Sequence, residues 1–281
     1  MKVNKTTVAN TTDISEKVKF SDKPLIPADK SSYWAKILDP WIYWLIEHNF
    51  SSVRIKNQEN YNLGNPDYAN LLYGNHSCFH DGQVAYYICR KAFNANFYMM
   101  IQELYKLPIL SKIGGFSVEK YSAIESLKSI NYASNLLAEK ENMLWIFPQG
   151  RVMPPDYRPV KFESGLSYIA NKVEGVNLIP VAIKYTFIRD VKPEIFAEIG
   201  EPIVINNGVS NKKELTQFLE EDFTSLSDSQ IERISQGNLD DYKYIYQSKL
   251  PVFKRIEPFM KNIIFDKRYL KKFKEASLKL E

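Results

Sequence analysis

Short apolar runs recur along the middle of the chain, and a glycine or a proline follows several of them. The strand-like runs are at residues 50–56, 69–73, 143–147, 178–183 and 197–205. Gly74 and Pro148 stop the second and third runs, while Gly200 and Pro202 break the last. Helical patterns lie between the runs, as at residues 81–93. Strands separated by helices predict an α/β domain whose mostly parallel sheet is flanked by helices.

Aromatic residues are concentrated near the N-terminus, where three of the four Trp fall within residues 34–44. Asp39 and Pro40 fit the cap and first turn of a helix that continues to His48. Apolar residues cover most of its circumference, so it is either buried or lies in a lipid interface. Because Trp and Tyr dominate, we predict a membrane-interface helix at residues 31–48, preceded by a flexible arm at residues 1–30.

The two ends of the chain are polar. The N-terminal arm has no apolar core of a signal peptide, and no run of about 18 apolar residues predicts a membrane-spanning helix. Residues 49–210 are expected to form the main domain, and residues 211–281 a helical extension packed on the same unit. From Lys249 onward, ten Lys or Arg face four Asp or Glu. Such a tail suits either anionic lipid head groups or solvent.

Charge and cysteine content exclude some classes of protein. The net charge of +4 is too small to indicate nucleic acid binding, so we expect no nucleic acid partner. The two cysteines, Cys78 and Cys89, cannot make a disulfide framework and fit a reducing compartment.

A candidate base lies where an apolar run passes into a helix. His76 and Asp81 are separated by four residues and follow the run that ends at Gly74. If the helix begins near His80, the Asp81 carboxylate can reach one imidazole nitrogen and fix the tautomer. The other nitrogen is then free to accept a proton from a substrate hydroxyl, so the pair can serve as a general base.

Three other interpretations of this segment remain open. Asp81 can simply cap the helix, with His76 a satisfied polar group. His76, His80 and Asp81 could begin a metal site, although the sequence offers no further His downstream for a third or fourth ligand. Cys78 could be a nucleophile activated by a neighbouring His, but no oxyanion-hole motif accompanies it.

Four blocks in order resemble the motifs of the glycerolipid acyltransferases, the family of the bacterial 1-acylglycerol-3-phosphate acyltransferases. The blocks are His76-x4-Asp81, residues 114–120 (GGFSVEK), residues 147–150 (FPQG) and residues 178–183 (LIPVAI). Phe162 and Gly165 also stand where the family has Phe-x-x-Gly. The resemblance covers residues 50–205.

The resemblance implies that His76 deprotonates an acceptor hydroxyl, which attacks an acyl thioester, while Asp81 supports the imidazolium. The acyl donor would be acyl-CoA or acyl carrier protein, with no cofactor and no metal. Substrate-binding positions carried over from the blocks, or placed beside them, are Gly115, Phe116, Lys120, Gln149, Gly150, Arg151, Arg158 and Pro180.

This sequence departs from the family at four positions. Lys120 replaces Arg in the second block, which keeps the charge but loses the bidentate fork for phosphate. In the third block Gln149 replaces Glu, and Arg151 precedes Val152 where the family has Thr-Arg. The acyl chemistry is unaffected, but the acceptor need not be lysophosphatidate.

The sequence therefore predicts an O-acyltransferase that acts on a lysophospholipid or a related amphiphile such as a glycolipid or a polar carotenoid derivative. Its partners are membrane lipids and the acyl donor, and its place is the cytoplasmic face of a membrane, as a peripheral or monotopic protein. The alternatives are a lipid or ester hydrolase that uses the same pair, and a non-catalytic lipid-binding relative. The oligomeric state is not predicted.

Overall fold

A computed structural model describes residues 24–249 of the chain. Most of the expected N-terminal arm (residues 1–23) and the basic tail from residue 250 lie outside the described residues. Residues 24–30 belong to the expected arm, yet they are tied to the sheet: Ile26 exchanges hydrogen bonds with Ser117, and Ala28 N donates to the Tyr132 hydroxyl. This part of the arm is therefore part of the folded unit.

The described chain forms one mixed sheet, in the strand order β4-β3-β5-β2-β6-β7-β1-β9 with β8 paired to β6. The strands are β1 (Ser52–Lys56), β2 (Ala69–Gly74), β3 (Asn96–Gln102), β4 (Gly115–Val118), β5 (Asn142–Ile146), β6 (Gly175–Thr186), β7 (Glu194–Ile199), β8 (Ile203–Asn206) and β9 (Lys243–Gln247). From β4 to β6 all neighbours are parallel, as are β1 and β7. The predicted fold class, a mostly parallel sheet flanked by helices, is confirmed.

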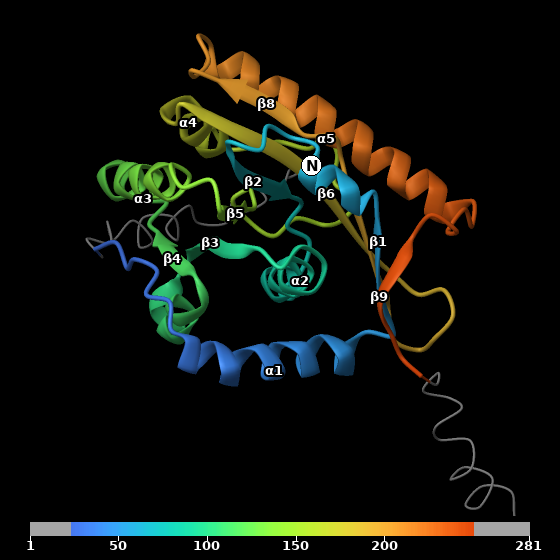
Figure 1. Cartoon of the computed structure of the whole chain (residues 1–281). Coiled ribbons are helices and arrows are strands. Elements are labelled where there is room, and N and C mark those ends of the chain that lie inside the picture. Colours follow the sequence, from blue (N-terminus) through green and yellow to red (C-terminus); the bar gives the residue numbers. More distant parts are fainter. Residues whose placement is uncertain (1–23, 250–281) are drawn as a thin grey trace, which may run out of the picture.

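Helices cover both faces of this sheet (Figure 1). They are α1 (Ser32–Asn49), α2 (Asp81–Ile88), α3 (Ala123–Leu136), α4 (Gly165–Lys172) and α5 (Lys212–Ser235), with short helical turns η1 (Gln58–Asn62), η2 (Cys89–Phe93), η3 (Leu104–Lys106) and η4 (Pro108–Ile113). One apolar cluster joins α1 and α2 to the sheet, and a second joins α3, α4 and α5 to the opposite face.

The strands in the middle of the sheet contribute side chains to both clusters. Leu72 and Trp145 point into the cluster below α2, while Leu71, Tyr73 and Leu144 belong to the cluster on the other face. All five side chains are fully buried. Parallel strands covered on both faces require apolar residues at successive positions, which explains why their sequences read as unbroken apolar runs.

The helix α1 differs from its prediction at its start. Ser31 caps it, accepting a hydrogen bond from Trp34 N, and Pro40 lies inside the helix. The prediction that Asp39 is the cap was wrong: its carboxylate instead accepts hydrogen bonds from the Tyr86 hydroxyl and, at 3.1 Å, from Arg90. These bonds join α1 to α2 and η2, and a proline is tolerated there because tertiary contacts hold the helix.

One face of α1 is buried and the other is exposed. Leu38, Ile42 and Ile46 pack into the core. The exposed stripe consists of Tyr33, Ile37, Trp41 and Trp44, each at least 46% exposed. Among the helices of residues 24–249, none combines the length and apolarity needed to cross a bilayer. The role of the stripe in a lipid interface stays a prediction.

The region after residue 210 is not helical throughout. The helix α5 packs on β6, but residues 243–247 form β9, which pairs antiparallel with β1. This corrects the prediction of a purely helical extension. The strand forms because β1 otherwise ends the sheet with unpaired backbone groups, which β9 satisfies.

Candidate active site

The segment that links β2 to α2 is held at the carboxyl ends of β2 and β6. A Cβ on Gly74 would lie 2.8 Å from the Val181 carbonyl oxygen, so no larger residue fits there. The Asn75 side chain then donates to Ile183 O and accepts from Ile183 N, both at 2.8 Å. These two hydrogen bonds fix the backbone immediately before His76.

His76 and Asp81 form the hydrogen bond that their spacing predicted. The distance from His76 Nδ1 to Asp81 Oδ2 is 2.8 Å. The Asp81 side chain is fully buried, while that of His76 is 25% exposed. A carboxylate only accepts hydrogen bonds, so the proton of a neutral imidazole lies on Nδ1. Nε2 then carries a lone pair, and the exposed part of the ring can offer it to a ligand.

Asp81 also organises the loop before it. Its Oδ2 accepts hydrogen bonds from the backbone N–H groups of Ser77 and, at 2.8 Å, Cys78. Oδ1 accepts from the Tyr185 hydroxyl and, at 3.5 Å, from the Cys78 thiol. The alternative interpretation of Asp81 as a helix cap was wrong: His80 holds the N-cap position, and Asp81 is the first residue of α2. The carboxylate satisfies loop donors N-terminal to α2, and it holds His76 at the same time.

The thiol of Cys78 is a poor candidate for a nucleophile. Burial, and next the charge of Asp81, raise its pKa above the usual value for cysteine. The thiol therefore stays protonated, whereas a nucleophilic cysteine needs the thiolate. Within residues 24–249, no three or more His, Cys, Asp or Glu side chains are grouped so as to hold a metal ion. The His80 ring instead packs edge-to-face on Phe50 and Phe79.

The loop after β5 supports the other side of His76. The Phe147 ring stacks on the imidazole, with centroids 4.7 Å apart. Gln149 Oε1 accepts from His76 N at 2.8 Å, and Met153 N donates to His76 O at 2.8 Å. Gln149 thus positions the histidine backbone. Its predicted contact with substrate stays a prediction.

Lys120 reaches the same loop from the turn between β4 and α3. Its ammonium lies 2.9 Å from Glu163 Oε1 and donates to Gly150 O at 3.3 Å. Gly150 has φ of +65°, and a Cβ there would lie 2.8 Å from Lys120 Nζ. The second and third sequence blocks therefore converge beside His76.

The remaining predicted binding residues lie elsewhere. Gly115 and Phe116 are buried in β4, and Pro180 is buried in β6. Arg151 is exposed and makes no hydrogen bond or ion pair within the described residues. Arg158 turns to α5, where Asp228 Oδ1 accepts from its Nε at 2.9 Å and Ser227 Oγ lies 3.2 Å from its Nη2. Its ion pair leaves it bound to the fold rather than to the loop of His76.

Tyr185 is the site residue that sequence reasoning missed. Burial, and next the Asp81 carboxylate, hold its pKa well above the usual value for tyrosine, so its hydroxyl remains a donor. It lies two residues beyond the fourth block, in the second half of β6. No motif marks it, and only the pairing of β6 with β2 brings it to Asp81.

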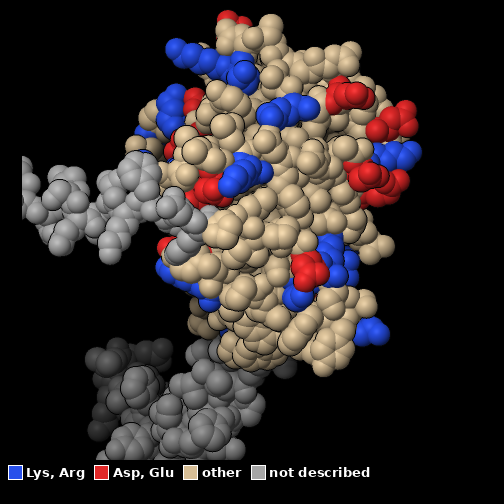
Figure 2. All heavy atoms as spheres, turned by 90° about the vertical axis from the view of Figure 1, so that its left-hand side faces the viewer, with Lys and Arg blue, Asp and Glu red and all other residues tan. Residues whose placement is uncertain are grey.

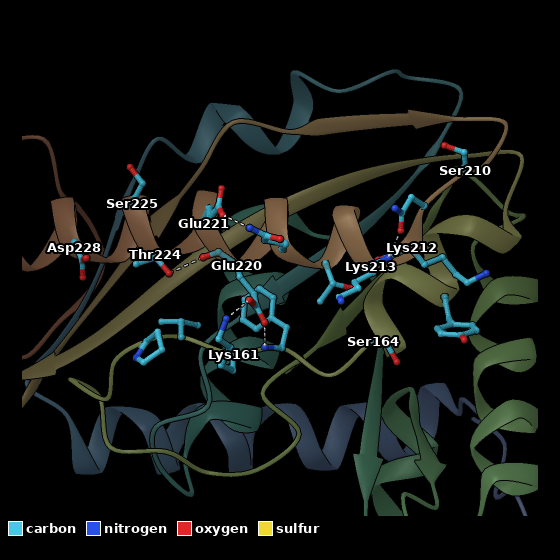
Figure 3. Close-up of a pocket in the computed structure, with 17 residues that line it drawn as sticks. Lys161, Ser164, Ser210, Lys212, Lys213, Glu220, Glu221, Thr224, Ser225 and Asp228 are labelled. Atoms are coloured by element: carbon cyan, nitrogen blue, oxygen red, sulfur yellow. Dashed lines mark hydrogen bonds and ion pairs between the residues drawn. The ribbon is translucent and has the colours of Figure 1, made fainter.

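A cavity of about 1070 Å³ lies away from the dyad, between residues 159–168 and α5 (Figure 3). Its buried acid, Glu220, already accepts from Phe162 N at 2.7 Å and from Lys161 at 2.8 Å. Lys161 and Glu220 thus form an ion pair in its wall, and neither His76 nor Asp81 lines it.

Two of three comparisons with known proteins find a match. A family model described as Acyltransferase matches residues 52–184, a segment that contains His76, Asp81, Lys120 and Gln149. A search of curated proteins finds no match. Among solved structures, the chain is similar to the crystal structure of the 1-acyl-sn-glycerophosphate (LPA) acyltransferase, PlsC, from Thermotoga maritima. That likeness has 22% sequence identity and a TM-score of 0.48, and it covers 70% of this chain and 78% of that chain.

The tautomer of His76 can be tested directly. In Asp81→Asn the side-chain amide can donate to Nδ1, so the imidazole proton should move to Nε2. Nitrogen-15 chemical shifts of histidine-labelled protein, recorded above the pH at which the rings titrate, should show this exchange for His76 and none for His48. An unchanged tautomer in the variant would contradict the assigned role of Asp81.

Proposed function

Residues 52–184 form a domain of the acyltransferase family, and on that premise we propose that the chain transfers a fatty acyl group from an acyl thioester to the hydroxyl of an amphiphilic alcohol. The donor is acyl-CoA or acyl carrier protein, and the acceptor is a lysophospholipid or a related lipid. The observation that carries the proposal is the hydrogen bond of His76 Nδ1 to the buried Asp81, which leaves Nε2 as a base.

In the first step, Nε2 of His76 takes the proton of the acceptor hydroxyl as its oxygen attacks the thioester carbonyl carbon. The charge that develops on the imidazolium is stabilised by Asp81, whose own position is fixed by Ser77, Cys78 and Tyr185. Stacking on Phe147 keeps the ring in one orientation, so little rearrangement is needed as the proton moves.

In the second step the tetrahedral intermediate collapses, its carbon–sulfur bond breaks, and the thiolate leaves. The imidazolium can return its proton to that thiolate, so base and acid are the same residue. A thioester is already activated, and therefore no covalent acyl-enzyme and no cofactor is required. The protonated thiol of Cys78 agrees with this scheme.

Access to lipid substrates is supported by the exposed apolar stripe of α1. Trp and Tyr side chains suit the boundary between head groups and hydrocarbon. Further apolar side chains are exposed beside Lys120, just before α3 and in its first turns: Tyr121, Ile124 and Leu127. Figure 2, seen from the side of α3 and β4, shows broad uncharged areas between scattered charges.

On this basis we propose that the protein is a peripheral enzyme at a membrane face. The free cysteines Cys78 and Cys89 fit the cytoplasmic one.

Replacing the base should abolish most of the turnover. A general base contributes about 10²- to 10⁴-fold, so His76→Ala should lower kcat by roughly that factor. Transfer from acyl-CoA and acyl carrier protein to a panel of lyso-lipids in detergent micelles, followed by mass spectrometry, measures this. His48→Ala serves as the matched control and should stay within about twofold of wild type. Near-normal turnover without His76 would refute its role, and release of free fatty acid without acceptor would favour the hydrolase alternative.

The Tyr185 hydroxyl should matter for rate and little for acceptor binding. In Tyr185→Phe the ring packing remains, but Asp81 Oδ1 keeps only the weak thiol donor. A hydrogen bond to a charged group contributes about 1.5–3 kcal/mol, so kcat should fall by roughly tenfold or more with KM nearly unchanged. Tyr244→Phe, on β9, is the control. A change confined to KM would show that Tyr185 does not act through the dyad.

Membrane binding should depend on the exposed face of α1. The double variant Trp41→Ser/Trp44→Ser removes two large apolar side chains without touching Leu38, Ile42 or Ile46. Flotation with vesicles of phosphatidylcholine and phosphatidylglycerol should show binding weakened by about tenfold or more. The control is Phe218→Ser on α5, a half-exposed aromatic on the opposite side of the sheet. Full retention of the double variant would remove α1 from the anchor.

A further inference from the structure

A cation close to the site, Lys120, is neutralised by a carboxylate of the protein itself. Lys120 Nζ lies 2.9 Å from Glu163 Oε1, and both side chains reach the surface, at 32% and 61% exposure. The backbone of Glu163 is also fixed at this place. Its N–H donates to Pro148 O at 2.7 Å, which joins it to the loop that contacts His76. A Cβ on Gly150 would lie 3.0 Å from Glu163 Cγ. The ion pair therefore lies across Gly150, the last residue of the third block.

Three other cations around this loop are also paired with carboxylates. Lys184 pairs with Asp156 at 2.6 Å, Lys161 with Glu220 at 2.8 Å, and Arg158 with Asp228. Of the Lys and Arg residues in the described loop 150–163, only Arg151 has no acidic partner within residues 24–249.

A phosphate monoester needs the opposite arrangement. It carries close to two negative charges near neutral pH and is bound by several cations or by a bidentate Arg. Here Lys120 stands in place of a bidentate Arg, and the carboxylate of Glu163 next to it repels an anion. A Lys–Glu pair instead offers donors and acceptors side by side, which suits hydroxyl groups that both donate and accept.

We infer that Glu163 is a specificity-determining residue that, with Lys120, selects an acceptor with an uncharged, hydroxyl-bearing head group and rejects a phosphate monoester. This rests on the proposed acyl transfer and narrows its acceptor. Glu163 touches no reacting atom; it acts on the head group through charge and hydrogen bonding.

The test compares three acceptors in the same detergent micelles: 1-acylglycerol, an alkyl glucoside and lysophosphatidate. The wild-type protein should have a higher kcat/KM for an uncharged acceptor than for lysophosphatidate. Glu163→Gln keeps the shape and removes the charge, so it should lower the KM for lysophosphatidate by about tenfold while changing that for the preferred uncharged acceptor much less. The control is Glu141→Gln, an exposed acid next to the amino end of β5, which should leave the preference unchanged.

Higher salt gives a second readout, because a charge effect at an exposed site is screened. The difference between wild type and Glu163→Gln towards lysophosphatidate should shrink as ionic strength rises. A wild-type preference for lysophosphatidate, or an unchanged preference in Glu163→Gln, would overturn the inference and leave the acyl transfer standing. Absence of transfer to every acceptor would refute both.

Discussion

The buried carboxylate of Asp81 organises the whole site. A charge without water around it is stable only when donors surround it, and here Asp81 accepts from the His76 ring, two backbone N–H groups and the Tyr185 hydroxyl. These donors come from the loop after β2 and from β6, so the carboxylate can be satisfied only when the strands are paired. The orientation of His76 therefore depends on the pairing of β2 with β6.

Two further loops complete the site around this centre. The loop after β5 contributes Phe147 against the imidazole and Gln149 against the backbone of His76. The turn between β4 and α3 brings Lys120 to Gly150 and Glu163. In the reaction that we propose, the dyad moves the proton, and the ion pair beside it selects the alcohol that is accepted. The two tasks lie on different elements, so the acceptor can change while the chemistry is kept.

Much of this could be expected from local patterns, and the failures have physical causes. The apolar runs predicted the buried parallel strands, and the spacing of His76 and Asp81 predicted their hydrogen bond. Asp39 was misread as a cap because its partners, Tyr86 and Arg90, lie about fifty residues away. The strand β9 was missed because a short alternating segment becomes a strand only when an open edge such as that of β1 is available.

The sequence by itself determined the class of fold and the identity of the candidate base, since both depend on residue type and on spacing along the chain. Only the tertiary structure decided what surrounds them. It brought Tyr185 to Asp81, turned Arg158 away to Asp228, and set Glu163 beside Lys120. Those contacts join residues some 40 to 100 positions apart. Their existence depends on strand order and loop packing, which the spacing of residues along a single chain does not encode.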